Sequence, residues 1–137
     1  MEKITYAVTV TVAGGPSLPI AGELKVDGYE KLDISVAAKV GTANGTADVA
    51  VAPGELAAVL LLVITPSVTN GTLAVRTSAN GAADIPLTGP ITLIGTAAVS
   101  LLGAKPDRLV FTNSGGAAAS VTILVGRKAT AAPAPPP

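Results

Sequence analysis

The side chains whose types and spacing come nearest to a catalytic arrangement are four carboxylates: Glu23, Asp27, Glu30 and Asp33. Paired carboxylates can act as general acid and as base or nucleophile in glycoside hydrolysis. These four, however, cluster around Asp27-Gly28, a dipeptide typical of a short turn, where charged side chains serve solubility and turn geometry. We therefore interpret them as structural residues.

The residues that most enzymes use for acid–base and metal chemistry are absent from the sequence. The chain contains no histidine and no cysteine. A Ser-His-Asp triad, a thiolate nucleophile and a zinc site of the Cys/His type therefore cannot be built. We expect a protein that is not an enzyme and that has no metal or cofactor.

Glycine-containing motifs predict turns rather than ligand sites. Neither Gly14-Gly15 nor Gly115-Gly116 precedes a segment with helical periodicity, which a phosphate-binding loop requires. Asn44-Gly45-Thr46 and Asn70-Gly71-Thr72 match the glycosylation pattern, but the first residues lack the charged-then-apolar layout of a secretory signal. We therefore assign both to hairpin turns and expect a chain made in the cytoplasm.

Charge is sparse and balanced. Nine Lys and Arg residues face nine Asp and Glu residues, and charged residues make up 13% of the chain, against about 25% in typical domains. No basic face or polybasic run is apparent, so we expect no nucleic acid and no membrane as partner. A surface this poor in charge tends to associate, and we expect copies or other proteins to cover much of it.

The aromatic residues are too few for a stacking platform of the kind that binds sugars or single-stranded nucleic acid. The chain has only Tyr6, Tyr29 and Phe111. Tyr6 and Phe111 occupy positions that alternation assigns to a core. Tyr29 lies beside the Asp27-Gly28 turn, and we select it as a candidate protein-contact residue.

Alternation of apolar and polar residues is the dominant pattern and predicts strands. It runs from Ile4 to Val12 and ends at Gly14-Gly15-Pro16. Two further sets, 18–26 and 32–40, predict a hairpin about Asp27-Gly28.

The apolar run from Leu56 to Ile64 suits a buried strand or a short helix, and its flanking Pro and Gly residues favour the strand. At nine residues it is too short to span a bilayer as a helix. Short strands follow at 73–77, 85–87 and 91–94, and 96–102 fits a strand or one helical turn. Leu109–Phe111 and Val121–Val125 predict a last strand pair.

About eight to ten short strands with frequent turns predict an all-β fold, a single antiparallel β-sandwich or jelly roll, over residues 1–128. Residues 129–137 form a separate extended tail rich in proline and alanine. The tail is either a solvated end or an element that lies across a neighbouring subunit. Its prolines join Tyr29 as candidate contact residues: Pro133, Pro135, Pro136 and Pro137.

One family resemblance lies in the stretch from Asp107 to Val125, DRLVFTNSGGAAASVTILV. It resembles the closing hairpin of the small β-sandwich decoration or cement proteins of tailed bacteriophages, and Thr9–Gly15, TVTVAGG, is similar to their first strand. The resemblance covers about the first 15 and the last 30 residues before the tail and carries no catalytic or ligand motif.

The resemblance implies a non-catalytic virion structural protein that binds the capsid exterior and stabilises it. Its partners would be the major capsid protein or another shell protein and further copies of itself, with a trimer favoured, on the capsid surface of the virion. Two alternatives stay open: an extracellular adhesin or carbohydrate-binding β-sandwich module, and a phage tail, fibre or baseplate component.

Overall fold

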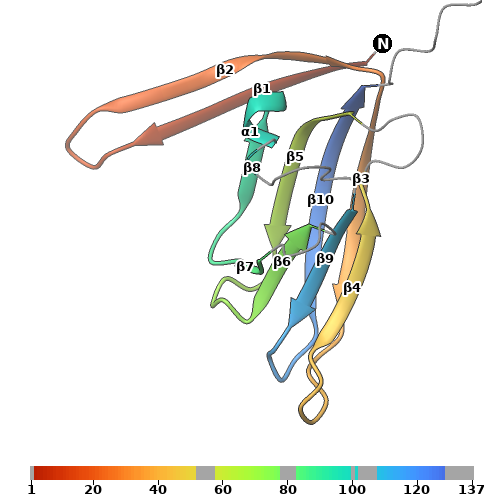
Figure 1. The fold of residues 1–137 in the computed structure, drawn as a ribbon. Helices are drawn as coiled ribbons and strands as arrows, with labels where there is room; N and C mark the ends of the chain where they lie inside the picture. Colours follow the sequence, from red (N-terminus) through yellow and green to blue (C-terminus); the bar gives the residue numbers. More distant parts are fainter. Residues whose placement is uncertain (1, 52–57, 78–82, 100, 102–107, 129–137) are drawn as a thin grey trace, which may run out of the picture.

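A computed structural model describes residues 2–51, 58–77, 83–99, 101 and 108–128, and these residues form an all-β sandwich with a projecting hairpin (Figure 1). The strands and the one short helix run in this order: β1 (Glu2–Thr11), β2 (Ser17–Val26), β3 (Gly28–Val36), β4 (Gly45–Ala50), β5 (Ala58–Pro66), β6 (Leu73–Thr77), β7 (Ile85–Pro86), β8 (Ile91–Ile94), α1 (Thr96–Val99), β9 (Arg108–Asn113) and β10 (Ala119–Lys128).

Two four-stranded antiparallel sheets form the body of the molecule. One sheet has the order β3-β10-β5-β8 and the other has the order β4-β9-β6-β7. Within the described residues the third sheet consists of β1 and β2 alone, and in Figure 1 this hairpin projects sideways from one end of the body. The prediction of an all-β sandwich is confirmed.

The hydrophobic core between the two sheets is built from every second residue along the strands. In β10, Val121, Ile123 and Val125 are buried while the residues between them are less buried, and in β9 the fully buried Phe111 takes the same role. Successive side chains of a strand point to opposite faces, so each sheet contributes every second residue to one shared cluster. The prediction that Phe111 packs in the core is confirmed.

Asn113 ties the two sheets together at the end of the body that lies away from the hairpin. Its amide is buried, and Nδ2 donates to the carbonyls of Ala117 (2.9 Å), Ala37 (3.2 Å) and Val36 (3.4 Å). Its Oδ1 accepts from Gly115 N–H (2.9 Å). One side chain thus fixes both the turn between β9 and β10 and the end of β3.

Arg127 has a similar role at the other end. Its side chain is only 5% exposed; Nε donates to the Val51 carbonyl, just after β4, and Nη2 lies 2.9 Å from Glu30 Oε2 on β3. A buried guanidinium is tolerated where its donors have partners, and here those partners belong to both sheets.

Four predicted hairpins are wrong. The chain does not fold back at Asp27-Gly28: β2 pairs with β1 over ten residues, and β3 pairs with β10. Similarly, β9 and β10 are not a pair, because β9 lies between β4 and β6 in one sheet and β10 between β3 and β5 in the other. The assignment of Asn44-Gly45-Thr46 and Asn70-Gly71-Thr72 to hairpin turns is also wrong, because the first leads from β3 into β4 and the second from β5 into β6, and each of these strand pairs is divided between the two sheets. All four errors arise because a turn signal shows where the chain bends but not whether the next strand joins the same sheet.

Other local predictions hold. Residues 58–64 of the apolar run that begins at Leu56 lie in β5, a strand with neighbours on both sides, and the ambiguous segment after Gly95 begins with one helical turn, α1. The tail at 129–137 lies outside the described residues, as do Pro133, Pro135, Pro136 and Pro137.

Replacing Asn113 by alanine tests the link between the sheets. Asn113→Ala leaves the three carbonyls and Gly115 N–H without this buried partner, so we expect the free energy of unfolding to fall by about 1–3 kcal/mol. The neighbouring Ser114→Ala removes an exposed hydroxyl that donates to Thr72 O (3.2 Å) and should cost less than about 0.5 kcal/mol. Urea unfolding measures both, and equal midpoints for the two variants would contradict this role of Asn113.

Candidate protein-contact surface

The hairpin of β1 and β2, residues 2–26, is called the arm. Its turn is tight: Val12 N–H donates to Pro16 O (2.9 Å), Gly15 N–H donates to Val12 O (2.8 Å), and Gly14 has a φ of 71°. Glycine adopts this left-handed conformation without the steric cost of a Cβ. The predicted turn at Gly14-Gly15-Pro16 is therefore confirmed.

The register of the arm separates its side chains into two faces. Residues directly opposite in an antiparallel pair lie on the same face, and the register pairs apolar with apolar residues, as in Val8 with Ile20 and Val10 with Leu18. The apolar face carries Ile4, Tyr6, Val8, Val10, Leu18, Ile20, Leu24 and Val26. The opposite face carries Lys3, Thr5, Ala7, Thr9, Thr11, Ser17, Pro19, Ala21, Glu23 and Lys25.

The base of the arm packs on the outer side of the sheet β3-β10-β5-β8, at Gly126. A Cβ placed on Gly126 would lie 2.9 Å from Ile4 Cδ1, 3.2 Å from Val26 Cγ1 and 3.3 Å from Leu61 Cβ. The absence of a side chain at Gly126 therefore lets Ile4 and Val26 approach the backbone of β10. Next to these side-chain contacts, a backbone hydrogen bond from Asp27 N–H to Arg127 O (2.8 Å) also joins the end of the arm to β10.

Tyr6 belongs to the arm and not to the sandwich core, which corrects the prediction made for it. It is half-buried and lies opposite Gly22, where an added Cβ would come within 2.5 Å of its hydroxyl oxygen. The ring thus lies across Gly22 and shields the backbone of β2. The period of two assigned Tyr6 to the correct face, but it carries no information about what covers that face.

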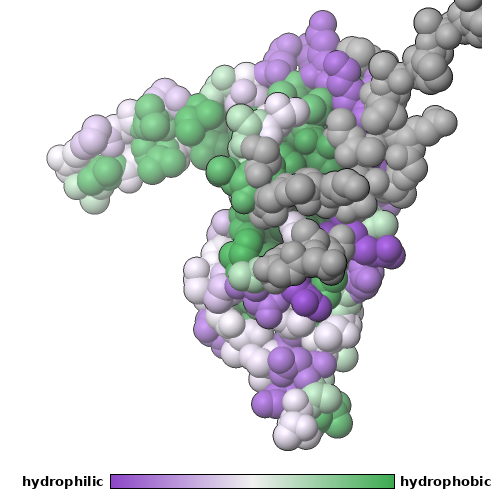
Figure 2. Space-filling model, viewed as in Figure 1, coloured by the Kyte–Doolittle hydropathy of each residue, from purple (hydrophilic) through white to green (hydrophobic). Residues whose placement is uncertain are grey.

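Beyond the base, the apolar face of the arm is open to solvent. Leu18 is 62% exposed, Val10 55% and Ile20 44%, and Val8 and Val12 are also among the exposed large apolar residues. Figure 2 shows this apolar surface along the arm, continuing onto the body beside it. Large apolar side chains that are contiguous and exposed mark an interaction surface.

The outer half of the arm is also devoid of charge. Residues 7–21 contain no Asp, Glu, Lys or Arg. A two-stranded hairpin alone is at best marginally stable in water. The outer half of the arm, which does not pack on the sandwich, therefore contributes little to the stability of the fold. The arm therefore combines an exposed apolar face with an outer half that carries no charge.

The four carboxylates that stand out in the sequence lie in separate surroundings: three have different side-chain partners, and Asp27 lies between β2 and β3. Glu23 lies 3.5 Å from Lys3 in the arm, Glu30 pairs with Arg127, and Asp33 accepts from Thr122 Oγ1 (2.9 Å) on the neighbouring strand. These contacts link strands, which fits a structural role.

Metal-binding clusters and long apolar helices are both missing from the part of the chain that the structure describes. Among those residues, no group of three or more acidic, histidine or cysteine side chains is arranged to hold a metal ion. In the same part of the chain, no helix has both the length and the apolar character that crossing a bilayer demands.

Tyr29 is exposed, at 60%, on β3 and lies opposite Gly126 in the register with β10. The structure therefore places this candidate contact residue next to the base of the arm. Sequence reasoning missed the larger surface formed by Val8, Val10, Leu18 and Ile20. The absence of charged residues from position 7 to position 21 was the sequence feature that could have identified this surface.

Filling the space at Gly126 tests how the arm is held. Gly126→Val should overpack the contact with Ile4 and Val26 and destabilise the docked arm by about 1–3 kcal/mol. Amide exchange of the arm should then accelerate while that of the sandwich core changes little. Gly116→Val is a matched control, because nothing lies within 4 Å of a Cβ at Gly116. Unchanged exchange in the arm of the Gly126 variant would contradict this anchoring.

Comparisons of the chain with protein-family models, with curated proteins and with solved structures found no match. A function for this chain therefore has to be inferred from the geometry of the arm and of the sandwich.

Proposed function

We propose that this chain is a non-catalytic structural protein that attaches to the outside of a larger protein shell and stabilises it. The observation that carries this proposal is the exposed apolar face of the arm, formed by Val8, Val10, Leu18 and Ile20. The resemblance of Asp107–Val125 and Thr9–Gly15 to phage decoration proteins supports the capsid of a tailed bacteriophage as that shell, with the major capsid protein as partner and the virion surface as location.

The energetics of the arm suit a repeated lattice. Burying a few hundred Å² of apolar surface contributes on the order of 10 kcal/mol, whereas association costs about 4–15 kcal/mol in lost freedom. A single arm therefore binds weakly to a single site. Copies joined to one another and attached to a symmetric shell bind much more tightly, because each further contact is intramolecular.

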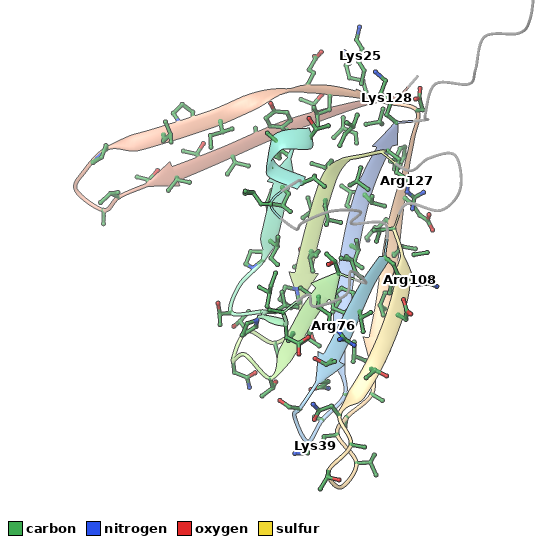
Figure 3. The ribbon with its side chains drawn as sticks, in the orientation of Figure 1. Lys25, Lys39, Arg76, Arg108, Arg127 and Lys128 are labelled. Atoms are coloured by element: carbon green, nitrogen blue, oxygen red, sulfur yellow. The ribbon has the colours of Figure 1, made fainter. Side chains whose placement is uncertain are left out.

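The distribution of cations supports a protein partner over a nucleic acid. Figure 3 shows Lys25, Arg127 and Lys128 near the base of the arm, Arg76 and Arg108 along the sandwich and Lys39 at its far end. Arg76, Arg108 and Arg127 each lie within 4 Å of a carboxylate: Asp84, Asp48 and Glu30. Nucleic acid binding draws on clustered cations that are free to replace counterions.

A glycan-binding role gains less support, because Phe111 is buried, Tyr6 is half-buried and Tyr29 is a single exposed ring. A tail, fibre or baseplate role would use the same apolar arm. The position of the chain on purified particles separates that role from capsid decoration.

Charge placed on either face of the arm tests the proposal with a matched pair. Leu18→Asp puts a carboxylate on the apolar face, and Ser17→Asp puts the same group on the opposite face one residue earlier; both positions are exposed. We expect Leu18→Asp to weaken binding to undecorated phage capsids by at least about tenfold, since burial of an unpaired charge is costly. Ser17→Asp should bind like the parent chain.

Co-sedimentation of each purified variant with the capsids measures the affinity, and electron microscopy of the parent complex locates the chain. Equal binding of the two variants would exclude the apolar face as the contact. No binding of the parent chain to any part of the particle, or binding only to the tail, would contradict a role in capsid decoration.

A further inference from the structure

The hydrogen bonds at the turn of the arm determine which backbone N–H and C=O groups face the neighbouring strand and which face outward. Val12 N–H donates to Pro16 O, and paired positions in an antiparallel ladder alternate between bonded and non-bonded. The register pairs even-numbered residues of β1 with even-numbered residues of β2, as in Val10 with Leu18. These even-numbered pairs are therefore the ones whose backbone groups form hydrogen bonds between the two strands. The odd-numbered residues of each strand direct their N–H and C=O groups outward, away from the other strand.

The two outward edges of the arm differ. On β2, the outward positions include Pro19, which has no N–H to donate, and Asp27, at the base, is already bonded to Arg127 O. On β1, the outward positions are Lys3, Thr5, Ala7, Thr9 and Thr11. Each of these has an N–H, and within the described residues β1 pairs with β2 alone.

The edge of β1 lacks the features that normally prevent an exposed strand edge from pairing with a strand of another molecule. Such edges are normally interrupted by proline, lysine or a bulge, or are very short. From Thr5 to Thr11 the edge of β1 has no proline and no charge, and the register with β2 is uninterrupted over ten pairs. Its threonines and valines also favour extended pairing. This edge is therefore a template for another strand.

We propose that the arm pairs with the arm of a second copy of this chain, β1 against β1 in antiparallel orientation, around a two-fold axis at Ala7. Full overlap of the outward positions sets Lys3 opposite Thr11 of the second copy and Thr5 opposite its Thr9, with Ala7 opposite Ala7 of the second copy. The pairing deepens the proposed function and rests on it, because it names one partner of the same arm.

The composition of β1 fits this self-pairing. Five outward residues in each copy offer up to ten backbone hydrogen bonds, a number typical of a specific interface. The one charged position, Lys3, meets a threonine and not a second lysine, so no like charges oppose each other.

The same register joins the apolar faces of the two arms. Residues directly opposite share a face, so Val8 falls beside Tyr6 of the second copy and Val10 beside Ile4 of the second copy. In each copy, Ile4 lies against the body at Gly126. The exposed outer half of one arm thereby comes next to the anchored base of the other.

The difference between the edge of β1 and the edge of β2 also limits the assembly to two copies. An isologous contact uses the same edge twice, and Pro19 interrupts the edge of β2 that would otherwise recruit a third arm. The geometry therefore points to a closed dimer. The trimer implied by the family resemblance would need a different contact, because one β1 edge accepts one strand.

A proline pair tests the edge directly. Ala7→Pro removes an outward N–H of β1, and Ala21→Pro removes one from β2; the two alanines are directly opposite each other, and neither N–H bonds within the arm. We expect Ala7→Pro to weaken dimerisation by roughly 30-fold or more, since two central bonds are lost. Ala21→Pro should dimerise like the parent chain. Light scattering during gel filtration gives the masses, and circular dichroism checks that both variants are folded.

A cysteine pair gives the same test without a backbone constraint, because the chain has no cysteine of its own. Ala7→Cys should form a disulfide-linked dimer under mild oxidation at least about tenfold faster than Ala21→Cys, since only position 7 meets its own copy at close range. Equal rates, a monomeric or trimeric parent chain, or a dimer that Ala7→Pro leaves intact would overturn the proposal. Because capsid binding is measured separately, a parent chain that binds capsids as a monomer would refute this pairing and leave the proposed function standing.

Discussion

Ten consecutive residue pairs join β1 to β2, and the outer surface of the molecule depends on that register. It places valine, leucine and isoleucine on one face and threonine, serine and proline on the other. A slip of one residue would set the apolar residues of one strand against the polar residues of the other and abolish the distinction. The turn from Val12 to Pro16 fixes the register, so five residues without a charged side chain determine where every side chain of the arm points.

The sandwich holds this arm through two adjacent residues of β10 that face opposite ways. Gly126 lies under Ile4 and Val26 on the outside, while Arg127 reaches inward to the Val51 carbonyl and to Glu30. The register of β10 with β5 shifts between these two residues, and such irregularities bend and twist a strand locally. Support of the arm and closure of the core are therefore achieved at one point of one strand.

Local patterns predicted most strands well: alternation located β1, β6 and β10 and placed Phe111 in the core, and Gly14-Gly15 marked a real turn. Pairing was harder to predict, because Asp27-Gly28 looks the same whether it closes a hairpin or leads from the arm into the sheet. The exposure of the arm was also hidden. Val10 and Val121 are each flanked on both sides by residues with a hydroxyl group, and only the three-dimensional arrangement shows that Val121 is covered and Val10 is not.

The central claim is that another protein surface covers the apolar face of the arm when the chain is at work. Hydroxyl-radical footprinting of the dilute free chain and of the same chain in its native assembly measures this directly, one side chain at a time. The account predicts that Val10, Leu18 and Ile20 are labelled readily in the free chain and become strongly protected in the assembly, whereas the exposed Val40 at the far end of the sandwich changes less. Equal labelling of the three arm residues in both states would contradict it.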